Sequence, residues 1–138
     1  MDWKLEAVII PVSDPDRSKA FYADKLGFPV DVDHQASETF RVIQVTPPGS
    51  ACSIVFGRGI GDGQPGTVKN CHLVVPNIEE AERHLTQAGI THGGIQHFHE
   101  GAMTPGPHPD KSDYSSYIFF EDPDGNSWAV QHVNPRPS

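Results

Sequence analysis

The chain has 138 residues, 36% of them hydrophobic and 20% charged, which is long enough for one compact domain whose core needs no disulfide or metal. It carries 10 Lys and Arg against 18 Asp and Glu, a formal net charge of −8. Nucleic acid and anionic membranes are therefore repelled at long range, with no basic patch to offset this, and we expect a small molecule or a protein as the partner.

We do not expect a signal for export in this sequence. Its first residues, Met1-Asp2-Trp3-Lys4, lack the positive and apolar regions of a secretory signal, and no apolar run is long enough to span a membrane. We therefore expect a cytoplasmic protein. Cys52 and Cys71 each lie in a strand-like run, and we expect two small buried side chains rather than a disulfide.

The first half of the chain predicts one strand, one helix and three further strands. Residues 5–12 are apolar and β-branched, which is typical of a strand. Asp14 is a candidate N-cap with Pro15 at the first helical position, and the helix is expected to end at Gly27. The three strands are expected at residues 30–34, 40–46 and 51–57.

A glycine-rich run at residues 57–66 is typical of a linker. It does not end in Gly-Lys-Ser/Thr and no helix follows it, so we do not expect a phosphate-binding loop. We expect module one at residues 1–57, the linker at 58–68 and module two at 69–138.

The second half repeats the pattern of the first. After a strand at 72–75, Asn77 and Glu80 predict the start of a helix that ends at Gly89. Strands are expected near 95–99, 117–121 and 127–133, the last two joined by an Asp-Pro-Asp-Gly turn. An insertion at 100–113 is expected to be a lid, a binding loop or a disordered segment. The expected order is β-α-β-β-β, twice.

Two segments resemble the vicinal oxygen chelate superfamily of glyoxalases, bleomycin resistance proteins and extradiol dioxygenases. The first strand and helix are similar in AVIIPVSDPDRSKAFYADKLGF, and the last hairpin is similar in FFEDPDGNSWAVQHV. With the repeated modules, the resemblance covers nearly the whole chain. It implies an α+β fold in which two tandem βαβββ modules form a curved mixed sheet around a cavity. It also implies a homodimer.

In metal-using members of this superfamily, four side chains bind an ion that stabilises an oxyanion of the substrate. The resemblance places these four positions at Ala7, Val55, Asn70 and Ala129. Ala and Val have no lone pair to donate, and one neutral amide does not hold a divalent ion. We therefore expect no standard metal site and no cofactor.

A shift of register by two residues would keep the same strand face, because side chains alternate with period two. Such a shift would bring His72 and Gln131 into the ligand positions of module two. In module one the shifted positions are Leu5 or Ile9, and Ser53 or Gly57. At most half of a metal site results.

The eight histidines leave a second metal hypothesis open. His97 and His99 are two residues apart and would share a strand face, while His108 lies in the insertion. Two histidines from a strand and one from a loop can ligate zinc or iron. This non-standard site for a divalent metal is the alternative; the simpler interpretation is a set of solvated side chains.

Polar side chains near the expected cavity are candidates for ligand binding. His72 shares a strand face with Asn70 and is expected to lie near Gln131. It could act as acid, base or hydrogen-bond donor, although a hydrogen-bonded sheet histidine is the simpler interpretation. Arg41 could bind a carboxylate, but the alternation around it does not fix its face.

Aromatic and apolar residues complete the candidate binding site. Tyr114 and Tyr117 flank the insertion and could close over a ligand, or could be ordinary sheet aromatics. The other positions expected to line the site are Ala7, Ile9, Val55 and Ala129.

Two functions are compatible with these residues. The first is a metal-free protein of the bleomycin resistance type, which binds a small organic molecule in an apolar cavity with a few polar anchors. The second is a lyase, isomerase or dioxygenase that uses a non-standard metal site or metal-free acid–base chemistry at His72. We favour the binding protein, because chelate chemistry without a chelated ion has no source of charge stabilisation.

Overall fold

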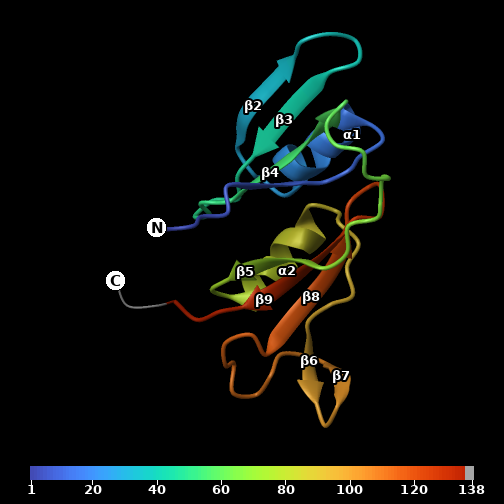
Figure 1. Cartoon of the computed structure of the whole chain (residues 1–138). Helices are drawn as coiled ribbons and strands as arrows, with labels where there is room; N and C mark the ends of the chain where they lie inside the picture. The colour runs from blue at the N-terminus through green and yellow to red at the C-terminus, as the bar shows by residue number, and fades with distance from the viewer. Residues whose placement is uncertain (136–138) are drawn as a thin grey trace. The chain divides into compact units, whose positions relative to one another are not determined.

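The computed structural model describes residues 1–135, and its contacts divide the chain into two compact units (Figure 1). The first unit comprises Met1–Val68 together with Asp122–Asn126, and the second comprises Lys69–Glu121 and the chain from Ser127 onward. Among the described residues, no helix combines the length and the apolar character needed to cross a bilayer.

The first unit is a four-stranded sheet with one helical segment. Its strand order is β1-β4-β3-β2. Strand β1 runs parallel to β4, and the other neighbours are antiparallel. The elements are β1 (Ala7–Ile9), α1 (Pro15–Lys19), the π-helix η1 (Ala20–Lys25), β2 (Val30–Gln35), β3 (Arg41–Val45) and β4 (Ser53–Arg58).

The second unit repeats this plan with one extra strand. Its strand order is β5-β9-β8-β6-β7, and β5 runs parallel to β9 just as β1 runs parallel to β4. The elements are β5 (Cys71–Val75), α2 (Ile78–Gln87), β6 (Gln96–His99), β7 (Ala102–Pro105), β8 (Ser116–Glu121) and β9 (Ser127–His132). The predicted α+β fold with two βαβββ modules is confirmed.

The predicted start and stop signals of both helices are confirmed. The side chains of Asp14 and Asn77 accept hydrogen bonds from backbone N–H groups in the first turn that follows each of them, and so satisfy donors that a helix start leaves free. Each helical segment is followed by a glycine with positive φ, 80° at Gly27 and 75° at Gly89. This left-handed conformation favours glycine.

One face of the first sheet packs against the helical segment and forms the core of the first unit. The paired residues Ile43 and Phe56, and Val45 and Ile54, are buried there. Tyr22 of η1 is completely buried, and its ring lies 5.3 Å from that of Phe56. Because side chains alternate across a strand, the intervening positions point away from the helical segment.

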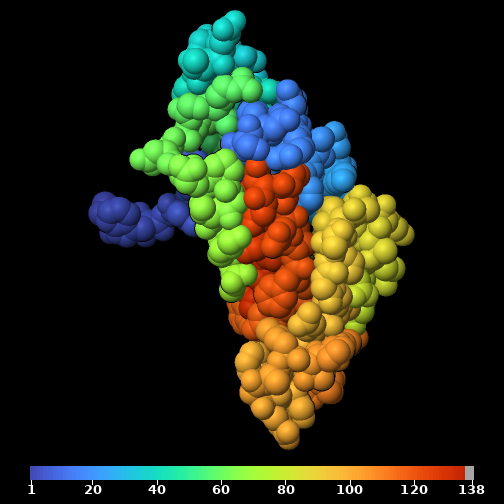
Figure 2. All heavy atoms as spheres, turned by 90° about the vertical axis from the view of Figure 1, so that its right-hand side faces the viewer, coloured from blue at the N-terminus to red at the C-terminus, as the bar shows by residue number. Residues whose placement is uncertain are grey.

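The first strand and the first helix differ from the predicted elements. Strand β1 covers only Ala7–Ile9 of the predicted 5–12, and residues before it project from the first unit with Trp3 and Leu5 exposed (Figure 2). The second half of the helix is a π-helix, in which the Leu26 N–H donates to the Phe21 carbonyl. Such π turns are rare and occur mostly as single turns within α-helices.

The predicted insertion contains a strand rather than only a loop. Strand β7 pairs with β6 in an antiparallel hairpin, with His99 opposite Ala102. The two residues between them, Glu100 and Gly101, both have positive φ, 48° and 81°, the conformation of a tight two-residue hairpin turn. The sequence signal was weak because glutamate rarely occupies such a position.

The turn between β8 and β9 belongs by its contacts to the first unit. The carboxylate of Asp122 accepts a 2.7 Å hydrogen bond from the Tyr22 hydroxyl and two 2.8–2.9 Å bonds from the side chain and backbone of Asn126. The Asn126 side chain also donates to the Pro11 carbonyl and accepts from the Val68 N–H. Asp122 and Asn126 are both buried, so these hydrogen bonds hold the turn in place.

The glycine-rich segment packs closely against the first unit. A side-chain carbon at Gly57 would lie 1.9 Å from the Arg41 carbonyl oxygen, and one at Gly66 would lie 2.2 Å from the Asp124 carbonyl oxygen. Only glycine permits such approaches. These two glycines therefore serve chain packing.

Candidate functional site

The candidate residues lie mainly on the sheet faces that point away from the helices. We call these the first helix-free face, in the first unit, and the second helix-free face, in the second unit. The first is formed by Ala7, Ile9, Val42, Gln44, Ser53 and Val55. The second is formed by His72, Val74, Tyr117, Phe119, Ala129 and Gln131.

On the first helix-free face, the structure brings the carried-over ligand positions together. Ala7 lies opposite Ser53, and Ile9 lies opposite Val55, on the parallel strands β1 and β4. Ala7 and Val55 are thus diagonal neighbours on one face. Neither side chain has an atom that can bind a metal.

The polar groups of the first helix-free face bond to one another. The Gln44 side-chain amide donates to the Ser53 hydroxyl at 3.3 Å, and the Ser53 and Thr46 hydroxyls are 2.7 Å apart. Thr46 also donates to the Asp31 carboxylate. The polar chemistry of this face is therefore largely satisfied within the chain.

On the second helix-free face, the structure brings together most of the residues predicted there. His72 lies opposite Ala129, and Gln131 lies between Val74 and Tyr117. These positions follow the register of the first unit, in which Ile9 corresponds to His72 and Val55 to Ala129. The strand-face alignment made from the sequence is therefore internally consistent.

Asn70 precedes β5 and is engaged with its neighbour. Its backbone N–H donates to the Ser127 hydroxyl at 2.7 Å, and its side-chain oxygen accepts from the same hydroxyl at 3.4 Å. The one ligand position with an oxygen atom is therefore already partly paired. The four carried-over positions do not fit a divalent ion.

Gln131 is the most unusual side chain of the second helix-free face. Only 7% of its surface is exposed, yet its carboxamide makes no hydrogen bond to any residue in the described part of the chain, 1–135. The amide N and O are nevertheless not fully enclosed, because Ser18 Oγ is the one fully buried side-chain N or O atom without a partner among residues 1–135. The sequence placed Gln131 on this face, but burial and pairing could be known only from the structure.

Two aromatic rings flank Gln131 and Ala129 on β8. Tyr117 is the cross-strand partner of Gln131, and Phe119 is that of Ala129. Their ring planes differ by 5° and their centroids are 5.9 Å apart. Tyr117 was a candidate for the site from the sequence and Phe119 was not, although two residues of separation on one strand is the signal for a shared face.

Arg41 lies on the opposite face of the first sheet, the one that the helical segment covers. Its guanidinium donates to the Asp33 carboxylate at 3.0 Å and to Asp16 at 2.7 Å, while Lys19 bonds to Asp33 at 2.7 Å. Arg41 and Lys19 hold the pKa of the Asp33 carboxyl well below its usual range. The guanidinium is thus committed to internal ion pairs.

The alternative histidine site does not assemble. The His97 ring lies 6.3 Å from that of His99 and 5.6 Å from that of His108, but a ring nitrogen of His97 is bonded to the Gly106 carbonyl at 2.7 Å. His97 is opposite Ser116, on the helix-covered side of the second sheet. Within residues 1–135, no group of three or more His, Cys, Asp or Glu side chains is placed to hold a metal ion.

Tyr114 lies outside the strands. It has a positive φ of 64°, its N–H donates to the His132 carbonyl at 2.8 Å, and its side chain is about half exposed. The Nδ1 of His132 accepts from the Ile78 N–H at the start of α2, and its Nε2 lies 2.9 Å from Asn134 Oδ1. This confirms that His132 and Gln131 point to opposite faces.

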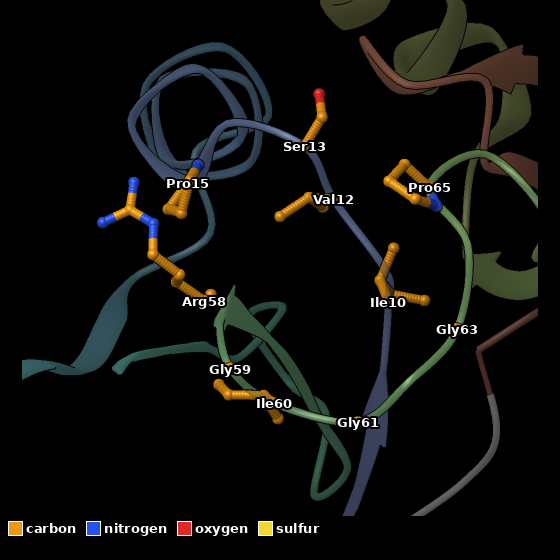
Figure 3. Close-up of a pocket in the computed structure, with 11 residues that line it drawn as sticks. Ile10, Val12, Ser13, Pro15, Arg58, Gly59, Ile60, Gly61, Gly63 and Pro65 are labelled. Atoms are coloured by element: carbon orange, nitrogen blue, oxygen red, sulfur yellow. The ribbon is translucent and has the colours of Figure 1, made fainter. Parts of the chain in front are cut away.

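A pocket of about 210 Å³ lies in the first unit, and none of the predicted site residues lines it (Figure 3). The ends of β1 and β4, the start of α1 and the glycine-rich segment surround it. Arg58 is the one titratable residue among those that line it. The pocket therefore lacks an acid–base pair for catalysis.

The sequence matches the family model of the glyoxalase/bleomycin resistance protein/dioxygenase superfamily over residues 4–130. The antibiotic binding protein TnmS3 from Streptomyces sp. CB03234 has a similar structure, with 24% identity, a TM-score of 0.75 and coverage of 96% of this chain and 98% of that chain. No curated protein matches significantly.

Two further solved structures support this assignment. A glyoxalase/bleomycin resistance protein from Streptomyces sp. CB03234 is 25% identical, with a TM-score of 0.72 and coverage of 94% and 100% of the two chains. A superfamily member from Sphaerobacter thermophilus DSM 20745 is 25% identical, with a TM-score of 0.67 and coverage of 95% and 98%. The chain belongs to the glyoxalase/bleomycin resistance protein/dioxygenase superfamily.

Proposed function

We propose that this chain binds a small organic molecule without a metal ion. The observation that carries the proposal is the chemistry of the superfamily's ligand positions, where Ala7, Val55 and Ala129 have no donor atom. The superfamily's chelate reactions need a cation to offset the charge of an oxyanion. These positions supply nothing that would hold such a cation.

The second helix-free face suits a bound organic molecule. It combines apolar and aromatic side chains with a few polar groups, which is the usual composition of small-molecule sites. The binding of an antibiotic by TnmS3 supports the proposal by analogy. Because fold alone does not fix function, the residues of the face carry more weight than this likeness.

Two measurements on untagged protein test the proposal. Elemental analysis is expected to find far less than one metal ion per chain, and a thermal-shift screen of antibiotics and other hydrophobic organic molecules is expected to find a stabilising ligand. A ligand at one hundred times its Kd stabilises the folded state by about 2.7 kcal/mol. A full equivalent of zinc, iron or nickel would overturn the metal-free proposal, and a screen without any stabilising ligand would overturn the binding role.

His72 distinguishes a binding protein from a metal-free enzyme. Its side chain is exposed and makes no hydrogen bond within the described residues. If it only anchors a ligand, His72→Ala should weaken binding by about tenfold or less, the net worth of one hydrogen bond. His99→Ala, exposed at the β6–β7 hairpin, is the matched control. Complete loss of a turnover reaction in His72→Ala alone would favour the enzyme.

The superfamily resemblance also supports a homodimer as part of the proposal. Sedimentation equilibrium is expected to give about twice the chain mass of 15.1 kDa. A mass of one chain at micromolar concentration would contradict the dimer and would leave ligand binding to be tested on the monomer.

A further inference from the structure

We infer that the ligand is a planar aromatic molecule whose edge carries a hydrogen-bond donor beside an acceptor, and that Gln131 pairs with this edge. The inference rests on the proposed binding function and deepens it by naming a ligand class. Three features of the second helix-free face carry it: the amide of Gln131 without a protein partner, the aromatic rings on β8, and a set of neighbours around Gln131 that contains no Lys, Arg, Asp or Glu.

The Gln131 amide indicates which polar groups the ligand carries. Gln131 lies on β9, an inner strand of the second sheet, between Val74 on β5 and Tyr117 on β8. Its carboxamide has one acceptor oxygen and an NH2 donor side by side. Within residues 1–135 neither is hydrogen-bonded, although only 7% of the residue is exposed. The group that satisfies both at once presents an adjacent donor and acceptor of its own, as another amide, a lactam or a hydroxy-ketone does.

The side chains on β8 beside Gln131 indicate that the ligand is aromatic. Tyr117 and Phe119 hold their rings parallel within 5°, and both belong to the same face as Gln131. Aromatic rings attract further rings in offset or edge-to-face contact. A flat ring system that lies along Tyr117 and Phe119 brings its edge to Gln131, because Tyr117 is the direct cross-strand partner of Gln131.

The residues around the Gln131 amide indicate that the ligand edge bound there is uncharged. The side chains that neighbour Gln131 and Ala129 on this face are His72, Val74, Tyr117 and Phe119. None is Lys, Arg, Asp or Glu, so a ligand carboxylate or ammonium group would be desolvated there without a permanent counter-charge. The matching edge is therefore neutral.

Four small probes separate these requirements. Naphthalene-2-carboxamide has the ring and the donor–acceptor edge, 2-acetylnaphthalene lacks the donor, 2-isopropylnaphthalene lacks both polar atoms, and cyclohexanecarboxamide lacks the aromatic ring. Isothermal titration should rank naphthalene-2-carboxamide first. It should bind at least tenfold more tightly than 2-isopropylnaphthalene and than cyclohexanecarboxamide.

Two variants and a control test whether the Gln131 amide causes the preference for naphthalene-2-carboxamide. Gln131→Met keeps the length of the side chain without its polar atoms, and should reduce the preference for naphthalene-2-carboxamide over 2-isopropylnaphthalene to less than twofold. Gln87→Met, at the exposed end of α2, is the matched control and should keep it. Tyr117→Leu should weaken all three naphthalenes by a similar factor and leave the preference intact.

A measurement on the unaltered protein covers the case in which Gln131→Met does not fold. The side-chain NH2 signals of Gln131 in a 15N-labelled sample should shift on addition of naphthalene-2-carboxamide and stay in place with 2-isopropylnaphthalene. Unchanged signals at saturation, or equal affinity for these two probes, overturn the inference. If a non-aromatic ligand binds instead and the naphthalenes do not, the inference fails while the binding function stands. If no molecule of any class binds, both fail.

Discussion

The two helix-free faces arise from the same module plan but treat their polar groups in opposite ways. On the first, Gln44, Ser53 and Thr46 hydrogen-bond to one another. On the second, the carboxamide of Gln131 has no hydrogen-bond partner within residues 1–135, and aromatic rings flank it. Because strand order and register are shared, the difference lies in the side chains alone. Two modules with the same backbone plan can thus differ in function through their side chains.

The largest expected effect comes from the turn that completes the first unit. Asp122→Ala removes the buried acceptor of the Tyr22 hydroxyl and of the Asn126 side chain. We expect the free energy of unfolding to fall by about 3–5 kcal/mol, as for other buried networks that lose a charged partner. Urea unfolding measures the change, and hydrogen exchange should show greater loss of protection in the first unit.

Asp24→Ala is the matched control, because Asp24 is exposed on the helical segment. It should change the free energy of unfolding by about 0.5 kcal/mol or less. A loss below about 1 kcal/mol in Asp122→Ala would show that the turn is not needed by the first unit.

The ion pairs on the helix-covered face of the first sheet provide a second, smaller contrast between the units. Arg41 bonds to both Asp33 and Asp16, whereas Lys111 of the second unit pairs with Glu79 alone. Arg41→Met should lower the free energy of unfolding by about 1 kcal/mol at neutral pH, and Lys111→Met by about 0.3 kcal/mol.

The effect of Arg41→Met should depend on pH with a definite sign. Arg41 lowers the folded-state pKa of Asp33, so its contribution to stability is present above the unfolded-state pKa of an aspartate, about 3.9, and is lost as pH falls through the lowered value. Unfolding curves at pH 7 and pH 2.5 should therefore show a smaller difference between wild type and variant at the acid pH. An equal difference at both would point to lost packing of the arginine stem.

Two glutamine substitutions compare the helix-free faces directly. Gln131→Met removes an amide that has no hydrogen-bond partner within residues 1–135 and should leave the free energy of unfolding of the ligand-free protein unchanged or raise it by up to about 1 kcal/mol. Gln44→Met removes an amide that bonds to Ser53 and should lower it by about 0.5–1 kcal/mol. If both variants shift stability in the same direction, the contrast between the two faces is wrong.

The smallest expected effect is at Ser18 in α1. Its hydroxyl is completely buried and has no hydrogen-bond partner among the described residues. Ser18→Ala should therefore leave the free energy of unfolding unchanged or raise it by about 0.5 kcal/mol, helped by the higher helix propensity of alanine. A thermal scan that shows a clear loss would reveal a hidden hydrogen bond, such as one to an internal water.

The fold could be predicted from the sequence because its signals are local. Asp14 and Asn77 mark helix starts through side chains that cap the nearest N–H groups, and Gly27 marks a helix end through its positive φ. The face of each strand residue follows from alternation, and the strand pairing puts Ala7, Val55 and Ala129 on the helix-free faces. The β6–β7 hairpin and the π-helix lacked such local signals.

The chemistry of the site was harder to predict from the sequence, because it depends on contacts between residues that are distant along the chain. Alternation could not settle the face of Arg41, because its role depends on Asp16 and Asp33, which belong to other elements. Similarly, Asn70 just before β5 and Gln131 on β9 both carry side-chain amides, but one bonds to Ser127 and the other does not. Whether a polar group is paired is a property of the folded neighbourhood.

The placement of Asp122–Asn126 in the first unit bears on how this chain could be divided or recombined. A cut near residue 68 would separate Met1–Val68 from the five residues that bond to Tyr22, Pro11 and Val68. Neither fragment would then carry all of its own unit. A protein split near residue 68 should therefore fold only when both fragments are supplied together. Exchange of half-genes between relatives at this point should likewise require that the incoming turn can bond to the first unit.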